Sequence, residues 1–461
     1  MFCHHLSLPG GVRPADKNRQ QDPDLTTTGV SNMTMLIEWY YWVMSMRADE
    51  LMFVLGILLF VDAPRYAYSV LAMAFWDVLK SGWTGRLPVS EGDSWAYCPT
   101  VSVVIAGHNE ADTIVDTMRS VWDRYPRLQL IVVDDGSTDG MAEAAREFAD
   151  GRDRILVLAR PERGGKSSAL NMGLQQATGE ILVTIDADSK LSDSSIHELI
   201  QPLQDPTVGA VSATVLAWNP FSSLAAWLQA YEYRQTIFLS RMMRGRTGVL
   251  GIVSGAFGAF RTDVLRRLGG WDVGPGEDGD LVLRLRKAGY RIAVAPYANC
   301  FTNVPTSFRR LFWQRCRWDR TVITFECRKH NDLGIPWSQN FRWSSFLLMV
   351  ERWFFNVVCV YTFWLYGLWL FVVYSFSAFQ LLLLLYCCGL CIELLQLLTL
   401  LFYSDRFRHD LRLGLVLPLY PLYQVFLKGV NLFALTREIL FRDSGEDNFV
   451  PERVRAATWR W

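Results

Sequence analysis

Three acidic groups and one basic, aromatic segment stand out as residues that could do chemistry. They are Asp134-Asp135, the pair Asp186 and Asp188, Glu277-Asp278, and the segment Gln314–Trp318. Carboxylate oxygens are the ligands that hard divalent cations prefer in proteins. In an extended chain Asp186 and Asp188 face the same side, so together they can hold one Mg²⁺ or Mn²⁺ whose shell is completed by diphosphate oxygens.

The acidic groups follow segments that can position them. Between about residues 98 and 332, short runs rich in Val and Ile alternate with helical stretches, which predicts an α/β domain with a mainly parallel sheet covered on both faces. We expect strands at 101–106, 129–133, 155–158 and 181–185, and helices at 111–124 and 141–149. Because ligands bind beyond the carboxyl ends of such strands, the residues that follow them should converge at one edge of the sheet.

Each motif alone has an ordinary structural explanation. Asp-Asp-Gly-Ser is also a common turn, Asp-x-Asp occurs by chance in loops, and a Gln-x-x-Arg-Trp segment can be a basic helix face on a lipid surface. These explanations do not account for the position of the first two motifs directly after predicted buried strands. The combination therefore predicts a ligand site.

Composition excludes several classes of protein. The formal net charge is zero, which argues against a general nucleic-acid binder, and we expect no nucleic-acid partner. The nine cysteines have no zinc-ligand or disulfide-framework spacing, and the six histidines form no pair at metal-ligand spacing. We interpret the cysteines as small hydrophobic residues of the membrane or core.

Apolar blocks flank this domain and predict an integral membrane protein. They cover residues 51–79, 353–374 and 379–403, each near or above the ~20 residues that cross a bilayer. The first block contains Asp62 and Arg65, which predicts either an ion pair on one helix face or a break at Pro64. Residues 415–435 contain two prolines and favour a re-entrant or interfacial helix pair.

Arginines after the third block and in the tail predict that both are cytoplasmic, which places the middle domain in the cytoplasm of a plasma or inner membrane protein. Residues 1–33 are polar, lack the apolar core of a signal peptide and are expected to be disordered. The expected domains are this extension, a membrane segment at 34–80, the catalytic domain at 98–332, membrane and interfacial helices at 338–436, and a tail at 437–461.

The motifs, taken in order, resemble one known family. They are Val101–Ile105 with Asn109-Glu110, Asp134–Ser137, Gly165-Lys166 with Ala169–Asn171, Asp186–Asp188, Ser254–Phe257, Gly276–Asp278 and Gln314–Trp318. From Pro99 to about Asp332 the chain resembles family 2 glycosyltransferases with the GT-A fold. It is most similar to membrane-integrated polysaccharide synthases, such as cellulose, hyaluronan and poly-N-acetylglucosamine synthases.

The resemblance implies roles at the donor side. Asp134 and Asp135 would hold the uracil and ribose of a UDP-sugar, with Asn109 and Glu110 beside them. Lys166 would approach the nucleotide or donor, while Asp186 and Asp188 would serve the metal and the diphosphate. From its neighbours alone, Lys166 is comparably well explained as a solvated loop lysine or as part of a phosphate-facing loop.

On the acceptor side, the resemblance to inverting enzymes implies one general base, for which we choose Asp278. Glu277 and Asp280 are rivals, and the acidic run could also be only a helix start. Gly276 departs from the Thr that is frequent in the family, which puts acceptor contacts in doubt. Ser254, Gly255 and Glu277 are further candidates for acceptor binding.

The segment at residues 308–325 is expected to lie at the membrane surface beneath the active site, because basic and aromatic residues alternate in it. There Arg317 can clamp the diphosphate, Gln314 can bind the donor or acceptor, and Trp318 can stack on the acceptor sugar. The amphipathic stretch at 218–243 could cradle the acceptor chain or simply be a packing helix.

The sequence thus predicts an inverting, metal-dependent, processive β-glycosyltransferase that uses a UDP-sugar and extrudes a growing glycan through its membrane helices. UDP-glucose and UDP-N-acetylglucosamine are the leading donors by resemblance. The alternatives are a single-transfer enzyme acting on a lipid and a membrane scaffold with an inactive nucleotide-binding domain. Membrane lipids are expected partners, and a homo-oligomer or partner protein could complete a narrow channel.

Overall fold

The computed structural model describes residues 37–42, 44–57, 63, 67–84, 97–272, 276–446 and 451–452. The chain divides into two compact units, residues 1–54 and 55–461, and the elements from α3 (Ser69–Thr84) onward belong to the second. In the region of the first apolar block the described helices are α2 (Ala48–Ile57) and α3 (Ser69–Thr84). The expected disordered extension at 1–33 and the proposed pair of Asp62 and Arg65 lie outside the described residues.

Four parallel strands form one half of the sheet, and they are the strands that the sequence predicts. They are β1 (Val101–Gly107), β2 (Leu128–Asp134), β3 (Ile155–Ala159) and β4 (Ile181–Asp186). The strand order is β3-β2-β1-β4, and the register pairs Gly107 with Asp134 and Ala106 with Asp186. This register brings the carboxyl ends of β1, β2 and β4 to one edge, as expected.

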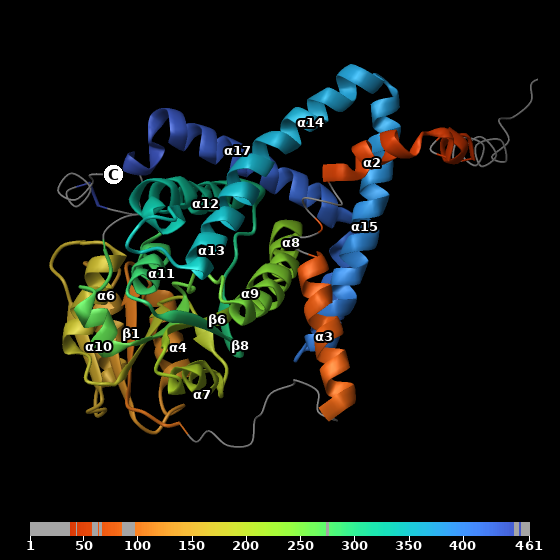
Figure 1. The fold of residues 1–461 in the computed structure, drawn as a ribbon. Coiled ribbons are helices and arrows are strands. Elements are labelled where there is room, and N and C mark those ends of the chain that lie inside the picture. Colours follow the sequence, from red (N-terminus) through yellow and green to blue (C-terminus); the bar gives the residue numbers. More distant parts are fainter. Residues whose placement is uncertain are drawn as a thin grey trace, which may run out of the picture. The chain divides into compact units, whose positions relative to one another are not determined.

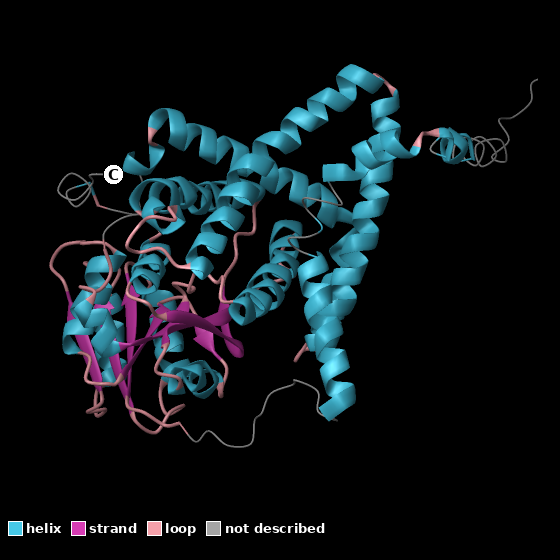
Figure 2. Cartoon of the chain, viewed as in Figure 1, coloured by secondary structure: helices cyan, strands magenta, loops and turns pink. Residues whose placement is uncertain are grey.

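The other half of the sheet makes it mixed. It contains β7 (Phe257–Arg261), β6 (Val208–Ala217), β8 (Arg291–Thr302) and the short β5 (Lys190–Leu191). Strand β7 runs antiparallel to both β4 and β6, and β6 runs parallel to β8. The magenta strands of Figure 2 form this continuous sheet. Strand β7 is not among the strands that the sequence analysis predicts.

Helices cover both faces because side chains along each parallel strand alternate between two cores. Val103 and Ile105 of β1 pack with α4 (Ala111–Val121) and α5 (Met141–Ala149), whereas Val104 packs with α6 (Lys166–Gln176) and α11 (Glu277–Lys287). Full burial of such a side chain contributes roughly 1.5–3 kcal/mol. Helix α4 ends earlier than predicted because Asp123 takes a left-handed conformation, with φ of 60°.

A bent helical segment joins this domain to the C-terminal helices. It consists of α8 (Leu224–Tyr233), the π-helical η4 (Arg234–Ser240) and α9 (Arg241–Thr247). Most of α8 is buried, and its side chains share one core with α15 (Ser377–Tyr403) and with the start of α17 (Tyr420–Phe441). Of the two explanations offered by the sequence, a packing helix fits this burial.

The C-terminal part contains the predicted apolar helices. Helices of length and composition sufficient to cross a membrane occur in the described residues at Trp343–Tyr374, Ser377–Tyr403 and Phe407–Phe441, which is compatible with membrane integration. The third is a helix pair, α16 (Phe407–Leu413) and α17, joined by a 3₁₀ segment that contains Pro418. Helix α12 (Phe308–Thr321) packs against α17 through a small core around Cys316 and Val430 (Figure 1). Helix α17 runs to Phe441, past the expected boundary at 437.

Candidate active site

One lysine gathers several of the predicted site residues at the carboxyl edge of the sheet. The Lys166 ammonium group bonds to the carboxylate of Asp186, lies 3.9 Å from Oε1 of Glu277 and donates to the carbonyl oxygen of Gly255 at 3.4 Å. Gly255 in turn donates its N–H to Oδ2 of Asp278 at 3.3 Å. Lys166, Asp186, Gly255, Glu277 and Asp278 therefore form one cluster, although they come from α6, β4, α11 and the segment before β7.

The charges in this cluster compensate one another only in part. Burial disfavours the charged form of Lys166, but Asp186 and Glu277 outweigh this effect and raise the pKa of Lys166. Burial raises the pKa of Glu277 to about 7, with Lys166 opposing this shift and Asp278 adding to it. A cluster with more carboxylates than ammonium groups is suited to a further cation.

Asp186 and Asp188, the proposed metal ligands, are two neighbouring carboxylates that could bind such a cation. Burial, together with the charges of Asp186 and Glu110, raises the pKa of Asp188 to about 6. Ser189 donates to Asp188 at 3.3 Å, and Lys166 pairs with Asp186 rather than with Asp188. No group of three or more His, Cys, Asp or Glu side chains in the described part of the chain is arranged to hold a metal ion. Two carboxylates that leave most of the shell to the substrate fit a divalent ion that binds with the donor.

The proposed nucleotide residues form the turns beside this cluster. Asp134 accepts from the N–H of Ser137 at 3.0 Å, and both carboxylate oxygens of Asp135 accept backbone N–H groups, from Gly164 at 2.8 Å and Gly165 at 2.7 Å. Asp134 and Asp135 are buried. In this structure Asp135 therefore shapes the loop that leads into Lys166.

Asn109 adopts a left-handed conformation, with φ of 57°, and joins the loop after β1 to the loop after β2 by hydrogen bonds. Its side-chain oxygen accepts from the N–H of Thr138 at 2.9 Å, and its own N–H donates to Oγ of Ser137 at 2.9 Å. Glu110 accepts from Thr113 at 3.0 Å. The loops after β1 and β2 are thus joined at the edge where the site lies, while roles for Asn109 and Glu110 in donor binding stay predictions.

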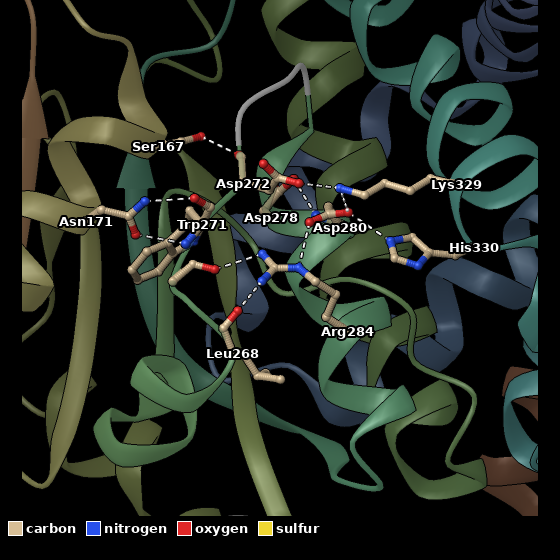
Figure 3. A network of polar contacts seen from close by, with 12 residues as sticks. Ser167, Asn171, Leu268, Trp271, Asp272, Asp278, Asp280, Arg284, Lys329 and His330 are labelled. Atoms are coloured by element: carbon tan, nitrogen blue, oxygen red, sulfur yellow. Dashed lines mark hydrogen bonds and ion pairs between the residues drawn. The ribbon is translucent and has the colours of Figure 1, made fainter. Parts of the chain in front are cut away.

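Asp278 and its rival Asp280 have different surroundings, and this difference separates their roles (Figure 3). Asp280 is fully buried and accepts from His330 at 2.8 Å and Arg284 at 2.8 Å, while Lys329 lies 2.7 Å away. Despite burial, which acts in the opposite direction, these partners lower the pKa of Asp280. Both oxygens of the Asp280 carboxylate are therefore occupied by basic neighbours. Asp278 accepts only backbone N–H groups in the described residues, from Gly255 and Gly279.

We expect Asp280→Asn to destabilise the protein, because removing one charge from a buried cluster leaves its partners uncompensated. The predicted loss is about 3 kcal/mol. Thermal unfolding of the detergent-solubilised variant measures it, and the exposed Asp263→Asn is the matched control, since Asp263 lies on α10 (Thr262–Arg267) and only pairs with Arg267 at the surface. An Asp280→Asn variant with the melting temperature of the control would refute the structural role.

The basic, aromatic segment lies on α12, and its expected position at the membrane surface stays a prediction. Trp318 is 38% exposed, and Oε1 of Gln314 is a buried atom without a hydrogen-bond partner in the described residues. The start of α11 packs closely against the end of α12. At Gly276 there is no room for a side chain, since a Cβ atom there would lie only 2.6 Å from Thr321. Gln314 and Trp318 share one helix face, one turn apart. Among the described residues, no hydrogen bond or ion pair joins Gln314 or Trp318 to Lys166.

The sequence analysis placed Arg241 in the amphipathic stretch at 218–243 but gave no role to this half-buried residue beside the site. Its guanidinium group donates to Ser254 at 2.5 Å and to Ser212 at 3.0 Å. Ser254, a predicted acceptor ligand, is thus turned toward Arg241 in this structure. Burial lowers the pKa of Arg241 to about 10, and the charge of Asp278 opposes this shift. Only the fold could reveal this contact, because Arg241 lies on α9 within a stretch that is otherwise a packing helix.

Known proteins share both the fold and the sequence of this domain. Residues 99–321 match the family model described as "Glycosyltransferase like family 2". A poly-beta-1,6-N-acetyl-D-glucosamine synthase from Staphylococcus epidermidis is 27% identical over 415 residues, which cover 86% of this chain and 97% of that protein. This chain is a glycosyltransferase with a family 2 domain at residues 99–321.

Further relatives agree with this assignment. The enzyme of the same name from Staphylococcus aureus strain MSSA476 is 32% identical over 221 residues, which cover 47% of this chain and 53% of that protein. A mannosyltransferase from Pyrobaculum calidifontis, solved in complex with GDP-Man and Mn²⁺, has a TM-score of 0.54 and 21% identity, and the match covers 84% of this glycosyltransferase and 99% of that chain. The likeness of the two structures confirms the GT-A fold. The expectation of an inactive scaffold is not supported.

Proposed function

We propose that this glycosyltransferase is an inverting, metal-dependent, processive β-glycosyltransferase that adds sugars from a UDP-sugar to a growing glycan. The observation that supports polymer synthesis is the extent of similarity to the S. epidermidis synthase. It covers 97% of that protein and 86% of this chain, so it extends beyond the 99–321 domain into the apolar helices. UDP-N-acetylglucosamine is therefore the first donor to test, and UDP-glucose the second.

The proposed chemistry uses Asp278 as the general base. Inversion needs one carboxylate that takes the proton of the acceptor hydroxyl while its oxygen attacks the anomeric carbon. Asp278 accepts two backbone N–H groups, which hold the carboxylate in place. Glu277 lies one residue away and faces Lys166, which suits it to a contact with the donor or the acceptor rather than to proton transfer.

The donor would bind beside Lys166, Asp186 and Asp188. A Mg²⁺ or Mn²⁺ ion held by the two aspartates would neutralise the charge of the departing diphosphate. The Mn²⁺ in the structure of the similar mannosyltransferase supports a requirement for a divalent ion. Lys166 sits at the first turn of α6, so the ammonium group and the helix N-terminus both favour bound phosphate. Arg317 would add a clamp on the diphosphate.

The acceptor would lie between α11 and α12. Trp318 offers an exposed aromatic face for the sugar ring, and the unpartnered oxygen of Gln314 offers a hydrogen-bond acceptor. Ser254, Gly255 and Glu277 would border the other side, next to the base. Helices α12 and α17 would lie at the cytoplasmic membrane surface, so that the product enters the membrane region directly. A second copy or a partner protein could complete the enclosure.

The test is transfer by purified protein in detergent or lipid, with Mg²⁺ or Mn²⁺ and labelled UDP-N-acetylglucosamine, UDP-glucose or GDP-mannose, followed by sizing of the product. We expect a long polymer from UDP-N-acetylglucosamine. One sugar on a lipid would instead establish the single-transfer alternative, and a GDP-sugar requirement would refute the proposed donor class. Release of UDP without any glycan would refute both forms of transfer.

A further inference from the structure

A buried ion pair stands directly behind the exposed tryptophan of α12. Arg315 and Glu232 form two parallel hydrogen bonds of 2.9 Å each, and their side chains are 12% and 8% exposed. Glu232 belongs to α8 of the catalytic domain, whereas Arg315 belongs to α12. Two parallel bonds fix the plane of the guanidinium group as well as its position.

The same guanidinium group also contacts the aromatic ring of Trp318. The central carbon of Arg315 lies 4.6 Å from the centroid of that ring. Arg315 and Trp318 are three positions apart on one helix, which places their side chains next to each other. One face of the Trp318 ring is therefore covered by Arg315, while the residue as a whole stays 38% exposed.

A third helix completes the chain of contacts. The hydroxyl of Tyr423, on α17, donates to Oε2 of Glu232 at 2.7 Å. Glu232 thus receives hydrogen bonds from α12 and from α17 at the same time. Replacing a buried ion pair by apolar residues is often neutral or stabilising, so stability alone does not explain why the pair is present. An alternative reason for the ion pair is that it holds the neighbouring Trp318 ring in place.

We propose that Glu232 and Tyr423 are positioning residues that hold Arg315 against Trp318 and thereby fix the face on which the acceptor sugar stacks. This inference rests on the proposed function, since it assumes that Trp318 binds the acceptor. Arg315 suits this task because a planar guanidinium can bind a carboxylate with two bonds and stack on a ring at once, which a lysine cannot do. Tyr423 links the stacking face to the position of α17.

The experiment compares Glu232→Gln with the wild type in extension of a short β-1,6-linked N-acetylglucosamine oligosaccharide from UDP-N-acetylglucosamine. We expect the KM for the oligosaccharide to rise about tenfold, with the KM for the donor and kcat at saturating acceptor within about twofold. Tyr423→Phe, which removes one hydrogen bond, should raise the acceptor KM about threefold. Binding of the oligosaccharide in the presence of UDP, measured by calorimetry, should weaken in parallel.

Two controls separate positioning from general damage. Tyr361→Phe removes a hydroxyl that contacts Thr436 at 3.0 Å between α14 (Cys359–Tyr374) and α17, and it should leave both KM values unchanged. In a Trp318→Ala background, Glu232→Gln should change the acceptor KM by less than about twofold, because its effect passes through the missing ring. Unfolding temperatures identify any variant that fails to fold, and the milder Tyr423→Phe then carries the test.

Several outcomes overturn the proposal. They are an unchanged acceptor KM in Glu232→Gln, a full effect of that substitution in the Trp318→Ala background, an effect on the donor KM alone, or an equal effect of Tyr361→Phe and Tyr423→Phe. Wild-type protein that neither binds nor extends the oligosaccharide would overturn this inference for an N-acetylglucosamine acceptor, and the proposed function would then be tested with UDP-glucose. That failure is distinguishable because it appears before any substitution is made.

Discussion

Asp278→Asn should lower the rate of sugar transfer by about 1,000-fold or more while donor binding stays within about twofold. The amide has the shape of the carboxylate but only one acceptor oxygen, so it can keep one of the two bonds from the N–H groups of Gly255 and Gly279, and the fold around the site should stay the same. It cannot take a proton from the acceptor hydroxyl. The measurement is the initial rate with labelled UDP-sugar, combined with calorimetric binding of UDP and metal to the same preparation.

Two comparisons make this result specific. Glu277→Gln should reduce transfer less than Asp278→Asn, because Glu277 faces Lys166 and acts on binding. Asp263→Asn, on the surface of α10, should transfer at the wild-type rate. Near-normal turnover of Asp278→Asn with intact donor binding would move the base to another residue, and Glu277 would be the first to examine.

Removal of divalent cations should abolish transfer, and added Mn²⁺ or Mg²⁺ should restore it. The expected loss is at least about 100-fold, since charge neutralisation by a bound metal is worth several kcal/mol in the transition state. Asp188→Asn should require a higher metal concentration for half-maximal rate, because it removes one of the two proposed ligands. The rate is measured after chelation and again across a titration with each metal.

A control distinguishes the metal site from the surrounding charge. Lys166→Met removes the ammonium group next to Asp186, so it should weaken donor binding without abolishing the response to metal. The far carboxylate Asp205, at the surface near Arg291, can be changed to Asn as a matched substitution with no expected effect on metal dependence. Full activity in the presence of excess chelator would exclude the proposed metal requirement.

The parallel half of the sheet could be predicted because its strands are continuous apolar runs bounded by turns. Each predicted strand is present and extends slightly further, and the helix at Met141–Ala149 has the predicted ends. The antiparallel strand β7 could not be predicted in the same way. Its five residues, Phe257–Arg261, include a glycine and an arginine, and its stability comes from pairing with β4 and β6 on either side. Such pairing depends on segments distant in sequence.

The site could be predicted as a set of acidic groups but not as a division of roles among them. Asp278 and Asp280 both lie in the first turn of α11, so the sequence alone does not separate their roles. They differ because His330 and Lys329, about fifty residues later in the chain, close around Asp280. The contact of Lys166 with Asp186 likewise depends on how the loop after β3 folds, which Asp135 controls through two backbone N–H groups. The spacing of residues along the sequence does not predict these tertiary contacts.

The π-helical segment between α8 and α9 has a consequence for how this architecture can change over evolutionary time. Each π turn holds about one residue more than an α turn, which rotates everything after it by roughly 100°. Within it, Arg234 binds Asp410 and Gln235 binds Glu393, both from the C-terminal helices, while Arg241 just after it turns back to Ser254. This continuous helical segment thus contacts both the C-terminal helices and the active-site region. Deletion of a single residue here would misplace these side chains more severely than most point substitutions. Related sequences should therefore preserve the length of this segment more strictly than its composition.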